Sequence, residues 1–279
     1  MLRRTKIVAT LGPATDDPGI LDKLIEAGVD VVRLNFSHDL PEMHMKRAEM
    51  ARERAHALGR QVGVLVDLQG PKIRIGIFKN GPVQLVEGEP FTINSDHPLD
   101  QGNKQCVGTT YKALPEDVSR GATLLLDDGR IVLWVDRVAG NEVICRVVVG
   151  GELSDNKGIN RQGGGLSAAA LTDKDRKDMK TAAAMQADYV AISFPRSAAD
   201  VEEARALLRA AGGKGGIVAK IERAEAVKAI EEIIAAADVL MVARGDLGVE
   251  IGDAAVPPIQ KRIIKLARKM NKVTITATQ

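Results

Sequence analysis

Apolar and polar positions follow two alternating rhythms in the first part of the chain. Short runs of β-branched and other apolar residues, typical of strands buried on both faces, are separated by segments of helical periodicity. The first helical segment has Asp17 as its N-cap, Pro18 at its first position and Gly28 at its end, and the second runs from about Pro41 to Leu58. Consecutive strand–helix units of this kind predict parallel strands. The strand runs are 6–12 (KIVATLG), 31–37 (VVRLNFS) and 62–68 (VGVLVDL).

The rhythm changes between residues 71 and 169. Apolar runs become shorter, helical periodicity is lost, and dipeptides that favour tight turns separate the runs. This stretch is therefore predicted to be an all-β domain, inserted between a first barrel part at 1–70 and a second at 170–279. The turn dipeptides are Asn80-Gly81, Asp128-Gly129 and Gly140-Asn141.

The alternation of strands and helices resumes after residue 169. The next segment is predicted to be a helix that begins with a capping box, formed by Thr172 and Asp175. Four more strands bring the total to seven, and the last one reaches Gln279. We therefore expect an α/β fold, a (β/α)8 TIM barrel that lacks its last βα unit. An open doubly wound sheet is the alternative, but no glycine fingerprint follows the first strand. The four strands are 188–194 (DYVAISF), 216–222 (GIVAKIE), 238–246 (DVLMVARGD) and 272–279 (KVTITATQ).

Polar residues gather at the carboxyl ends of the predicted strands, where barrels of this type build their sites. Because strand side chains alternate between faces, Arg33, Asn35 and Ser37 should share one face, as should Lys220 and Glu222. The other strand ends carry Asp67, Ser193, Arg244, Asp246, Thr276 and Thr278.

The chemistry of these residues favours a metal site and an anion site. Glu222 and Asp246 provide two carboxylates, which is what Mg²⁺ usually takes from a protein. Arg33 and Lys220 provide positive charge for a phosphorylated or carboxylated substrate, so the pattern indicates metal-assisted phosphoryl or carbonyl chemistry. A structural ion pair between Arg33 and Asp67 is the alternative interpretation.

Composition narrows the function classes. The 39 basic and 37 acidic residues nearly cancel, and aromatic residues make up only 3% of the chain, so nucleic-acid and membrane partners are not expected. Cys106 and Cys145 are predicted to be reduced thiols. The apolar run near the N-terminus is short and is broken by Gly12 and Pro13, which is unlike a signal peptide or an anchor. We expect a cytoplasmic protein.

Seven motifs in this order resemble the pyruvate kinase family, over residues 3–279. The resemblance implies phosphate transfer from phosphoenolpyruvate to ADP, giving pyruvate and ATP, with Mg²⁺ (or Mn²⁺) as cofactor. It also implies that the inserted domain is a mobile β-barrel lid and that the full-length form is a homotetramer. The motifs are VVRLNFSH, VDLQGPKIRIG, LLLDDGRI, NKGIN, AKIERAEAV, ARGDLGVEIG and TITATQ.

The resemblance also implies a role for individual residues. Lys220 would stabilise the transferring phosphoryl group and the enolate, Arg33 would contact the phosphate, and Thr278 would lie near the methylene carbon that is protonated. The implied divalent-metal ligands are Glu222 and Asp246. Further implied contacts are Ser193, Gly245 and Asp246 for the substrate, Pro13 and Arg74 for the nucleotide, and Asn35, Ser37, Asp67 and the Leu68 carbonyl for a monovalent cation.

Four departures from the family pattern shape further expectations. Lys72 stands where many members have a glutamate and require potassium; its ammonium could reach back towards Asp67, so we expect no potassium requirement. Asp39 replaces a usual glycine in a turn, where aspartate tolerates a left-handed backbone, and Met43 replaces a tyrosine found near the adenine in some relatives. The chain stops before an eighth strand and a carboxyl-terminal domain. The missing strand favours a non-catalytic fragment as the alternative. A metal-dependent aldolase of the pyruvate-enolate type, which also uses a glutamate and an aspartate on neighbouring strands, is a second alternative, but it has no reason to carry RLNFSH or the inserted domain.

Overall fold

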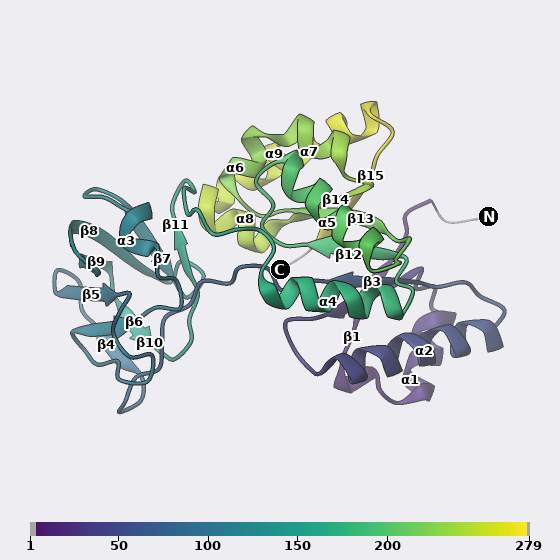
Figure 1. Cartoon of the computed structure of the whole chain (residues 1–279), viewed down its shortest axis with the longest axis horizontal. Coiled ribbons are helices and arrows are strands. Elements are labelled where there is room, and N and C mark those ends of the chain that lie inside the picture. Colours follow the sequence, from purple (N-terminus) through teal and green to yellow (C-terminus); the bar gives the residue numbers. More distant parts are fainter. Residues whose placement is uncertain (1–3, 278–279) are drawn as a thin grey trace.

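A computed structural model describes residues 4–277 of the chain. Seven parallel strands form one curled sheet in the order β1-β2-β3-β12-β13-β14-β15, so the expected α/β barrel architecture is confirmed (Figure 1). Within the described residues, β1 and β15 are the two edges of this sheet. The strands are β1 (Val8–Leu11), β2 (Val31–Asn35), β3 (Gly63–Asp67), β12 (Tyr189–Ile192), β13 (Gly216–Ile221), β14 (Val239–Ala243) and β15 (Val273–Ala277).

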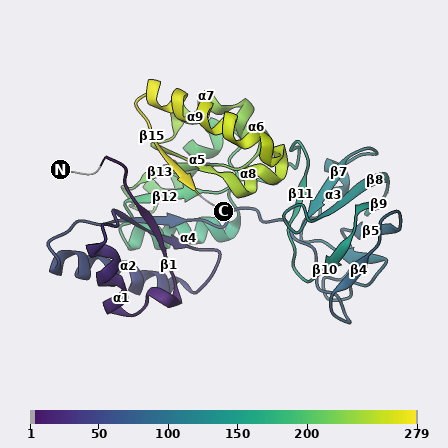
Figure 2. The same cartoon turned by 180° about the vertical axis from the view of Figure 1, so that it is seen from behind.

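Helices surround the outer side of this sheet (Figures 1 and 2). The largest apolar core lies between them and the sheet, with Val32 and Leu34 of β2 and Leu21 and Ile25 of α1 among its fully buried side chains. None of the helices in the described part of the chain is long and apolar enough to cross a membrane. The helices are α1 (Pro18–Glu26), α2 (Pro41–Ala57), α4 (Asp173–Ala184), α5 (Ala198–Ala210), α6 (Ala224–Lys228), α7 (Ile230–Ala236), α8 (Arg244–Ile251) and α9 (Val256–Lys269), with 3₁₀ turns η1 (Pro13–Thr15) and η2 (Asp253–Ala255).

The predicted helix caps are confirmed. The Asp17 carboxylate accepts the N–H of Gly19 at 2.7 Å at the start of α1, and Gly28 follows the helix with a φ of 103°. At α4, Thr172 and Asp175 form the reciprocal capping box, in which the Asp175 carboxylate accepts the Thr172 N–H at 2.8 Å. Local hydrogen-bonding residues therefore fix where these helices begin.

The inner face of the curled sheet changes from apolar to polar along the strands. Near the amino ends of the strands, the side chains on this face are apolar. Side chains on one face recur every second residue, and two residues further along three of the strands this face carries Arg33, Asp67 and Lys220. The sheet thus holds a charged layer above an apolar floor. The buried part of that floor is Leu65, Ala191, Val218, Val239 and Met241.

The remaining strands and one short helix form a separate unit, which we call the β module (β4–β11 with α3). It contains a six-stranded sheet in the order β11-β7-β8-β9-β5-β6 and a two-stranded sheet β10-β4, and it has its own apolar core. Helix α3 was not predicted. The elements are β4 (Val83–Leu85), β5 (Pro90–Asn94), β6 (Cys106–Gly108), α3 (Leu114–Asp117), β7 (Thr123–Leu126), β8 (Ile131–Ala139), β9 (Glu142–Val149), β10 (Gly151–Leu153) and β11 (Ile159–Arg161).

Several turns adopt the left-handed backbone that their residues favour. Asp128 and Gly129 have φ values of 55° and 85° between β7 and β8, and Gly140 has a φ of 58° between β8 and β9, as the turn dipeptides predict. Asp39 has a φ of 61°, and its carboxylate accepts a hydrogen bond from Arg47 at 2.6 Å. The replacement of the usual glycine by aspartate is therefore accommodated.

Several strand ends were predicted too far along the chain. Strands β12 and β13 end just before Ser193 and Glu222. Strand β2 ends at Asn35, so Ser37 lies in the following turn. Strand β14 ends at Ala243, and Arg244 and Asp246 lie in the first turn of α8. An acidic residue is favourable there because the helix dipole is positive at that end. Cys106 and Cys145 are free thiols, as predicted.

Candidate active site

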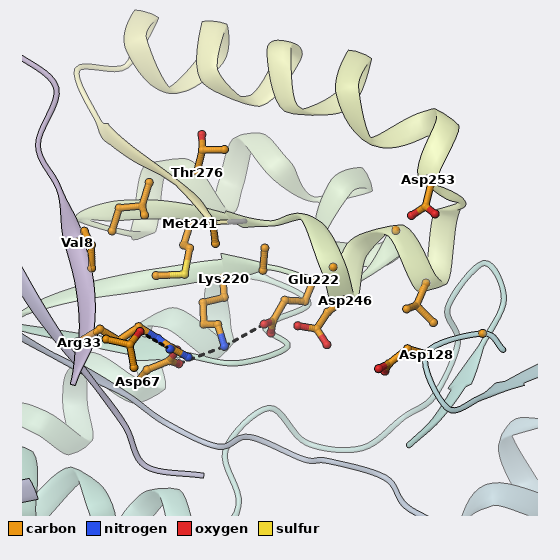
Figure 3. A pocket seen from close by; sticks show the side chains of 18 of the residues that line it. Val8, Arg33, Asp67, Asp128, Lys220, Glu222, Met241, Asp246, Asp253 and Thr276 are labelled. Atoms are coloured by element: carbon orange, nitrogen blue, oxygen red, sulfur yellow. Dashed lines mark hydrogen bonds and ion pairs between the residues drawn. The ribbon is translucent and has the colours of Figure 1, made fainter. Parts of the chain in front are cut away.

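A cavity of about 980 Å³ runs along the inner face of the parallel sheet, from the amino end of β1 to the carboxyl ends of the strands (Figure 3). Its walls come from the inner face of the sheet and from the start of α8, and the β module adds Leu125, Asp128, Gly129 and Gln162. A ligand in this cavity would therefore contact both parts of the molecule. The predicted residues that line it are Arg33, Asp67, Lys220, Glu222, Gly245, Asp246 and Thr276.

Lys220 is the centre of the charged layer. Its Nζ lies 2.9 Å from Glu222 Oε1, 3.1 Å from Asp67 Oδ1 and 2.8 Å from the Ser193 hydroxyl. Burial disfavours the charged amine, but the carboxylates of Glu222 and Asp67 outweigh it and raise the pKa of Lys220. Lys220 is therefore an ammonium group held at the wall of the cavity.

Arg33 and Asp67 form the ion pair that was the alternative interpretation of these residues. Arg33 Nε and Nη2 each lie 2.6 Å from Asp67 Oδ2, and Nη1 donates to the Thr10 hydroxyl at 2.9 Å. Arg33 nevertheless lines the cavity and keeps 26% of its side chain exposed, against 1% for Asp67. The pair leaves the guanidinium accessible to an anionic ligand.

Glu222 and Asp246 face the cavity from neighbouring elements (Figure 3). Glu222 Oε2 accepts the N–H of Phe194 at 2.7 Å, while Oε1 lies 2.9 Å from the Lys220 ammonium. Burial raises the pKa of Glu222, opposed by the charge of Lys220. The carboxyl group of Asp246 is exposed at the first turn of α8.

This donor set fits a divalent cation that keeps part of its water shell. The part of the chain that the structure describes has no cluster of three or more His, Cys, Asp or Glu residues that could hold a metal alone. Mg²⁺ usually takes one or two carboxylates and completes its octahedron with water and substrate oxygens. The exposed Asp246 and Glu222 Oε1, which faces the Lys220 ammonium, are the two carboxylate ligands that meet that requirement.

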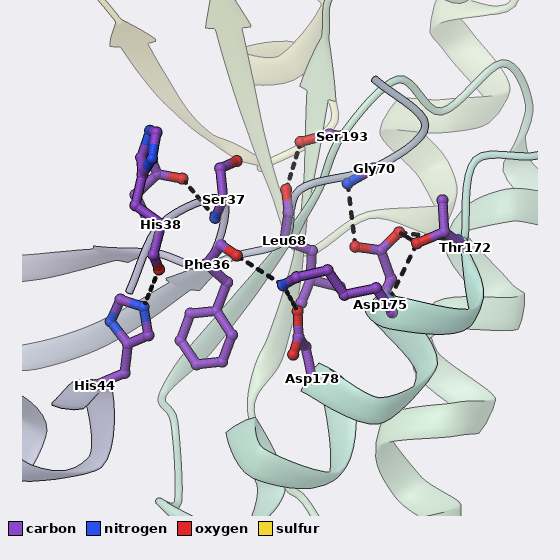
Figure 4. Close-up of polar contacts among 12 residues, drawn as sticks. Phe36, Ser37, His38, His44, Leu68, Gly70, Thr172, Asp175, Asp178 and Ser193 are labelled. Atoms are coloured by element: carbon purple, nitrogen blue, oxygen red, sulfur yellow. Dashed lines mark hydrogen bonds and ion pairs between the residues drawn. The ribbon is translucent and has the colours of Figure 1, made fainter. Parts of the chain in front are cut away.

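The four residues predicted for a monovalent cation lie at and just beyond the carboxyl ends of the neighbouring strands β2 and β3, and Figure 4 labels Ser37 and Leu68 among them. Asn35 is paired with Asp67 in the strand register, the Asn35 side-chain oxygen accepts the Ser37 N–H at 3.1 Å, and the Leu68 carbonyl accepts the Ser193 hydroxyl at 2.7 Å. Asp67 is turned towards Arg33 and Lys220.

Lys72 was expected to reach Asp67, but the two side chains form no ion pair within the described residues. Among the described residues, the ion-pair partners of Asp67 are Arg33 and Lys220. Gly70 turns the chain towards the β module before it reaches Lys72. Its φ is 66°, and its N–H donates to the Asp175 carboxylate at 3.0 Å. Lys72 instead lines a second cavity.

This second cavity, of about 370 Å³, lies between the β module and the ends of β12 and β13. Arg74 lines it, whereas Pro13 is exposed and is not among the residues that line either cavity. Burial, with repulsion from Arg74, lowers the pKa of Lys72. Lys157 lines the second cavity, and Asp128 lines both cavities. Neither residue was given a role from the sequence, although Lys157 lies in the motif NKGIN and Asp128 in the motif LLLDDGRI. Thr278 lies outside the described residues.

Two side chains and one main-chain carbonyl from the part of the chain after β13 hold the segment that leaves the β module. Arg223 donates to the Leu166 carbonyl at 3.1 Å, Glu225 accepts the N–H of Gly165, and the Glu250 carbonyl accepts the N–H of Gly163 at 2.9 Å. These contacts join the two parts of the molecule beside the second cavity.

Glu250 makes this junction sensitive to pH. Its side chain is 4% exposed. Burial, with repulsion from Glu225, raises the pKa of Glu250 to about 7, although the Ala224 N–H, Arg223 and Asn160 favour the charged form. The native carboxyl group therefore stays protonated from about pH 4.5 to about 7, a range in which it ionises in the unfolded chain.

We expect Glu250 to lower the free energy of unfolding by up to about 3 kcal/mol as the pH rises through this range, because the native state binds the extra proton. Urea unfolding at several pH values, compared with Glu250→Gln, measures the effect. The glutamine variant should gain stability relative to the parent as the pH rises. The same pH dependence in both proteins would contradict the prediction.

Comparisons with known proteins agree with this geometry. Residues 2–279 match the family model "Pyruvate kinase, barrel domain". The whole chain is 56% identical to pyruvate kinase II of Salmonella typhimurium, over 281 residues, and 47% identical to a pyruvate kinase of Mycobacterium tuberculosis, over 279 residues. It covers 58% and 59% of those curated relatives, respectively.

The structure resembles the crystal structure of a pyruvate kinase from Cryptosporidium parvum with a TM-score of 0.94 and 34% identity. The likeness covers 99% of this chain and 58% of that one. The family model extends over both the parallel sheet and the β module. The chain therefore belongs to the pyruvate kinase family.

Proposed function

We propose that this chain carries the active site of a pyruvate kinase, which transfers the phosphoryl group of phosphoenolpyruvate to ADP and forms pyruvate and ATP. The observation that carries the proposal is the Lys220 ammonium, held between two carboxylates in a cavity that Arg33 also lines. This reaction requires positive charge around a transferring phosphoryl group, with little covalent chemistry from the protein.

Arg33 and Lys220 are the groups that would neutralise the phosphoryl oxygens of the substrate. Both reach the cavity from the inner face of the sheet, and their shared partner Asp67 holds them in place. Ser193 hydrogen-bonds Lys220, and Gly245 at the start of α8 lines the same cavity. We assign the substrate to this side of the cavity.

Glu222 and Asp246 are the residues that would hold Mg²⁺ (or Mn²⁺). When bound there, the cation would supply positive charge to the carboxylate and phosphate oxygens of the substrate. Lys220 would then stabilise the enolate oxygen after transfer, since its ammonium has the charge and the position for it. Thr278 is assigned to proton transfer to the methylene carbon by family resemblance alone.

The nucleotide is assigned to the second cavity. Lys72, Arg74 and Lys157 line it and carry the positive charge that phosphate groups require. Pro13 is assigned to the nucleotide by family resemblance alone. The remaining proposals from the family are the division into residues 1–70, 71–169 and 170–279, with the middle part closing over the substrate, a homotetrameric full-length form, and a location in the cytoplasm.

Pyruvate formation from phosphoenolpyruvate and ADP tests the proposal directly. The reaction would be coupled to lactate dehydrogenase and followed by NADH oxidation, with Mg²⁺ present. We expect turnover that requires both ADP and the divalent cation. Absence of turnover would contradict the proposal for this chain, and pyruvate release without ADP would mean that water, in place of ADP, accepts the phosphoryl group.

Potassium should not be required for this activity. Lys72 replaces the glutamate found in potassium-dependent members, and Arg33 and Lys220 already balance the charge of Asp67. We expect equal rates, within error, when tetramethylammonium replaces potassium at constant ionic strength. Lys72→Glu is the matched variant and should gain a potassium requirement. Strong stimulation of the parent protein by potassium would refute the prediction.

A further inference from the structure

Phe194 has a backbone conformation that is rare for a bulky residue. Its φ is 58°, in the range that glycine favours, and its side chain is buried. Pro195 follows directly and further restricts the backbone of the residue before it. Such a conformation persists only where the surroundings hold it, and it is found at functional sites more often than elsewhere.

This conformation directs the Phe194 N–H at the carboxylate of Glu222. The nitrogen lies 2.7 Å from Glu222 Oε2, the length of a strong bond to a charged acceptor. Oε1, the other oxygen, lies 2.9 Å from Lys220 Nζ at the cavity wall. With Oε2 engaged by the backbone, Oε1 is the oxygen turned towards Lys220 and the cavity, where a bound cation would share it with the ammonium.

Contacts on several sides of Phe194 hold the conformation. The Arg223 guanidinium lies 5.3 Å from the centre of the Phe194 ring. Gly70 packs against the same turn so closely that an added Cβ would lie 3.2 Å from the ring and 2.6 Å from Ser193 Cβ. The Ser193 hydroxyl accepts a hydrogen bond from Lys220. It donates one to the Leu68 carbonyl (Figure 4). The turn is therefore fixed from both the barrel and the loop after β3.

We infer that Phe194 is a positioning residue for Glu222: its left-handed backbone fixes the carboxylate in the orientation in which Oε1, with Asp246, would accept a divalent cation. The inference rests on the proposed function, because it concerns the same metal site. Groups that hydrogen-bond a metal-binding carboxylate contribute about 10- to 100-fold to metal affinity. Phe194 would do so through its main chain, and its ring serves to hold that main chain in place.

Two variants separate the role of the backbone from the role of the ring. Phe194→Gly and Phe194→Ala both remove the ring, but only glycine adopts a φ of 58° freely. Mn²⁺ binding, measured by calorimetry or by electron paramagnetic resonance, should weaken by about tenfold or more in the alanine variant and by less than about threefold in the glycine variant. If the ring acts only by packing, the glycine variant should bind no better than the alanine variant. Equal or weaker Mn²⁺ binding by Phe194→Gly than by Phe194→Ala would therefore overturn the inference.

A second measurement keeps the inference testable if a variant does not fold. In the parent protein, the Phe194 amide should exchange its hydrogen at least about a thousandfold more slowly than in an unstructured peptide, and Glu222→Ala should remove most of that protection. Fast exchange in the folded parent protein would overturn the inference. Failure of the parent protein to bind Mn²⁺ would contradict the metal site of the proposed function, while amide exchange would still decide whether Phe194 holds Glu222.

Discussion

Replacement of Lys220 by alanine is expected to lower pyruvate formation by about a thousandfold or more, because the loss of one charged group aimed at the reacting atoms has an effect of this order. The ammonium is fixed by Glu222, Asp67 and Ser193 at distances of 2.8–3.1 Å. A positive charge held in this way requires no rearrangement during the reaction. Steady-state rates with saturating phosphoenolpyruvate and ADP measure the loss.

Metal binding separates this role from general damage to the site. Without Lys220, the two buried carboxylates lose their shared cation, so the pKa of Glu222 should rise further. At alkaline pH, Mn²⁺ binding should weaken by no more than about tenfold. The loss of Mn²⁺ affinity should grow as the pH falls, because protons then compete for Glu222. Lys228→Ala, at an exposed position on α6, is the matched control and should keep the parent rate. Turnover of Lys220→Ala within tenfold of the parent rate would refute the role of Lys220.

Sequence periodicity was sufficient to predict the charged layer of the site. Arg33, Asp67 and Lys220 follow apolar inner-face residues by two positions on three separate strands. Parallel strands in a curled sheet bring their carboxyl ends to one edge, so residues at those ends meet without any further information. The helix caps at Asp17 and Thr172 were predictable for a similar reason, since a cap depends on residues within one turn.

Contacts made by turns and between the two parts of the molecule were not predictable in this way. Lys72 was expected at Asp67 because its side chain is long enough, but the Gly70 turn carries it to the second cavity. The spacing of apolar residues at intervals of two or 3.6 positions predicts strands and helices, but it does not indicate in which direction a turn sends the chain. Asp246 was assigned to a strand because α8 begins at Arg244, directly after the last residue of β14, and no loop residues mark the boundary.

The contact between Phe194 and Glu222 is of the same kind. The two residues are 28 positions apart, and the bond uses a main-chain N–H whose direction depends on an unusual φ. Side-chain patterns carry no signal for it, because phenylalanine is not a residue that favours left-handed turns. The contributions of Asp128 and Lys157 also depend on how the β module faces the barrel sheet.

Replacement of Glu222 by glutamine is expected to lower turnover roughly a thousandfold, because a neutral amide removes one of the two carboxylates available to the divalent cation. Mn²⁺ affinity should fall in parallel, which distinguishes this variant from Lys220→Ala. Glutamine keeps the size of the side chain, and its amide oxygen still accepts the Phe194 N–H. The thermal midpoint should therefore stay close to that of the parent protein.

The stability of Glu222→Gln follows from the burial of the residue it replaces. Glu222 is 1% exposed and burial raises its pKa, so a neutral side chain removes a desolvation cost while Lys220 keeps Asp67 as its partner. Glu231→Gln makes the same chemical change at an exposed position on α7 and should alter neither Mn²⁺ binding nor turnover. Parent-like Mn²⁺ affinity in Glu222→Gln would mean that the cation binds elsewhere, whereas a large loss of stability would mean that the carboxylate mainly balances the charge of Lys220.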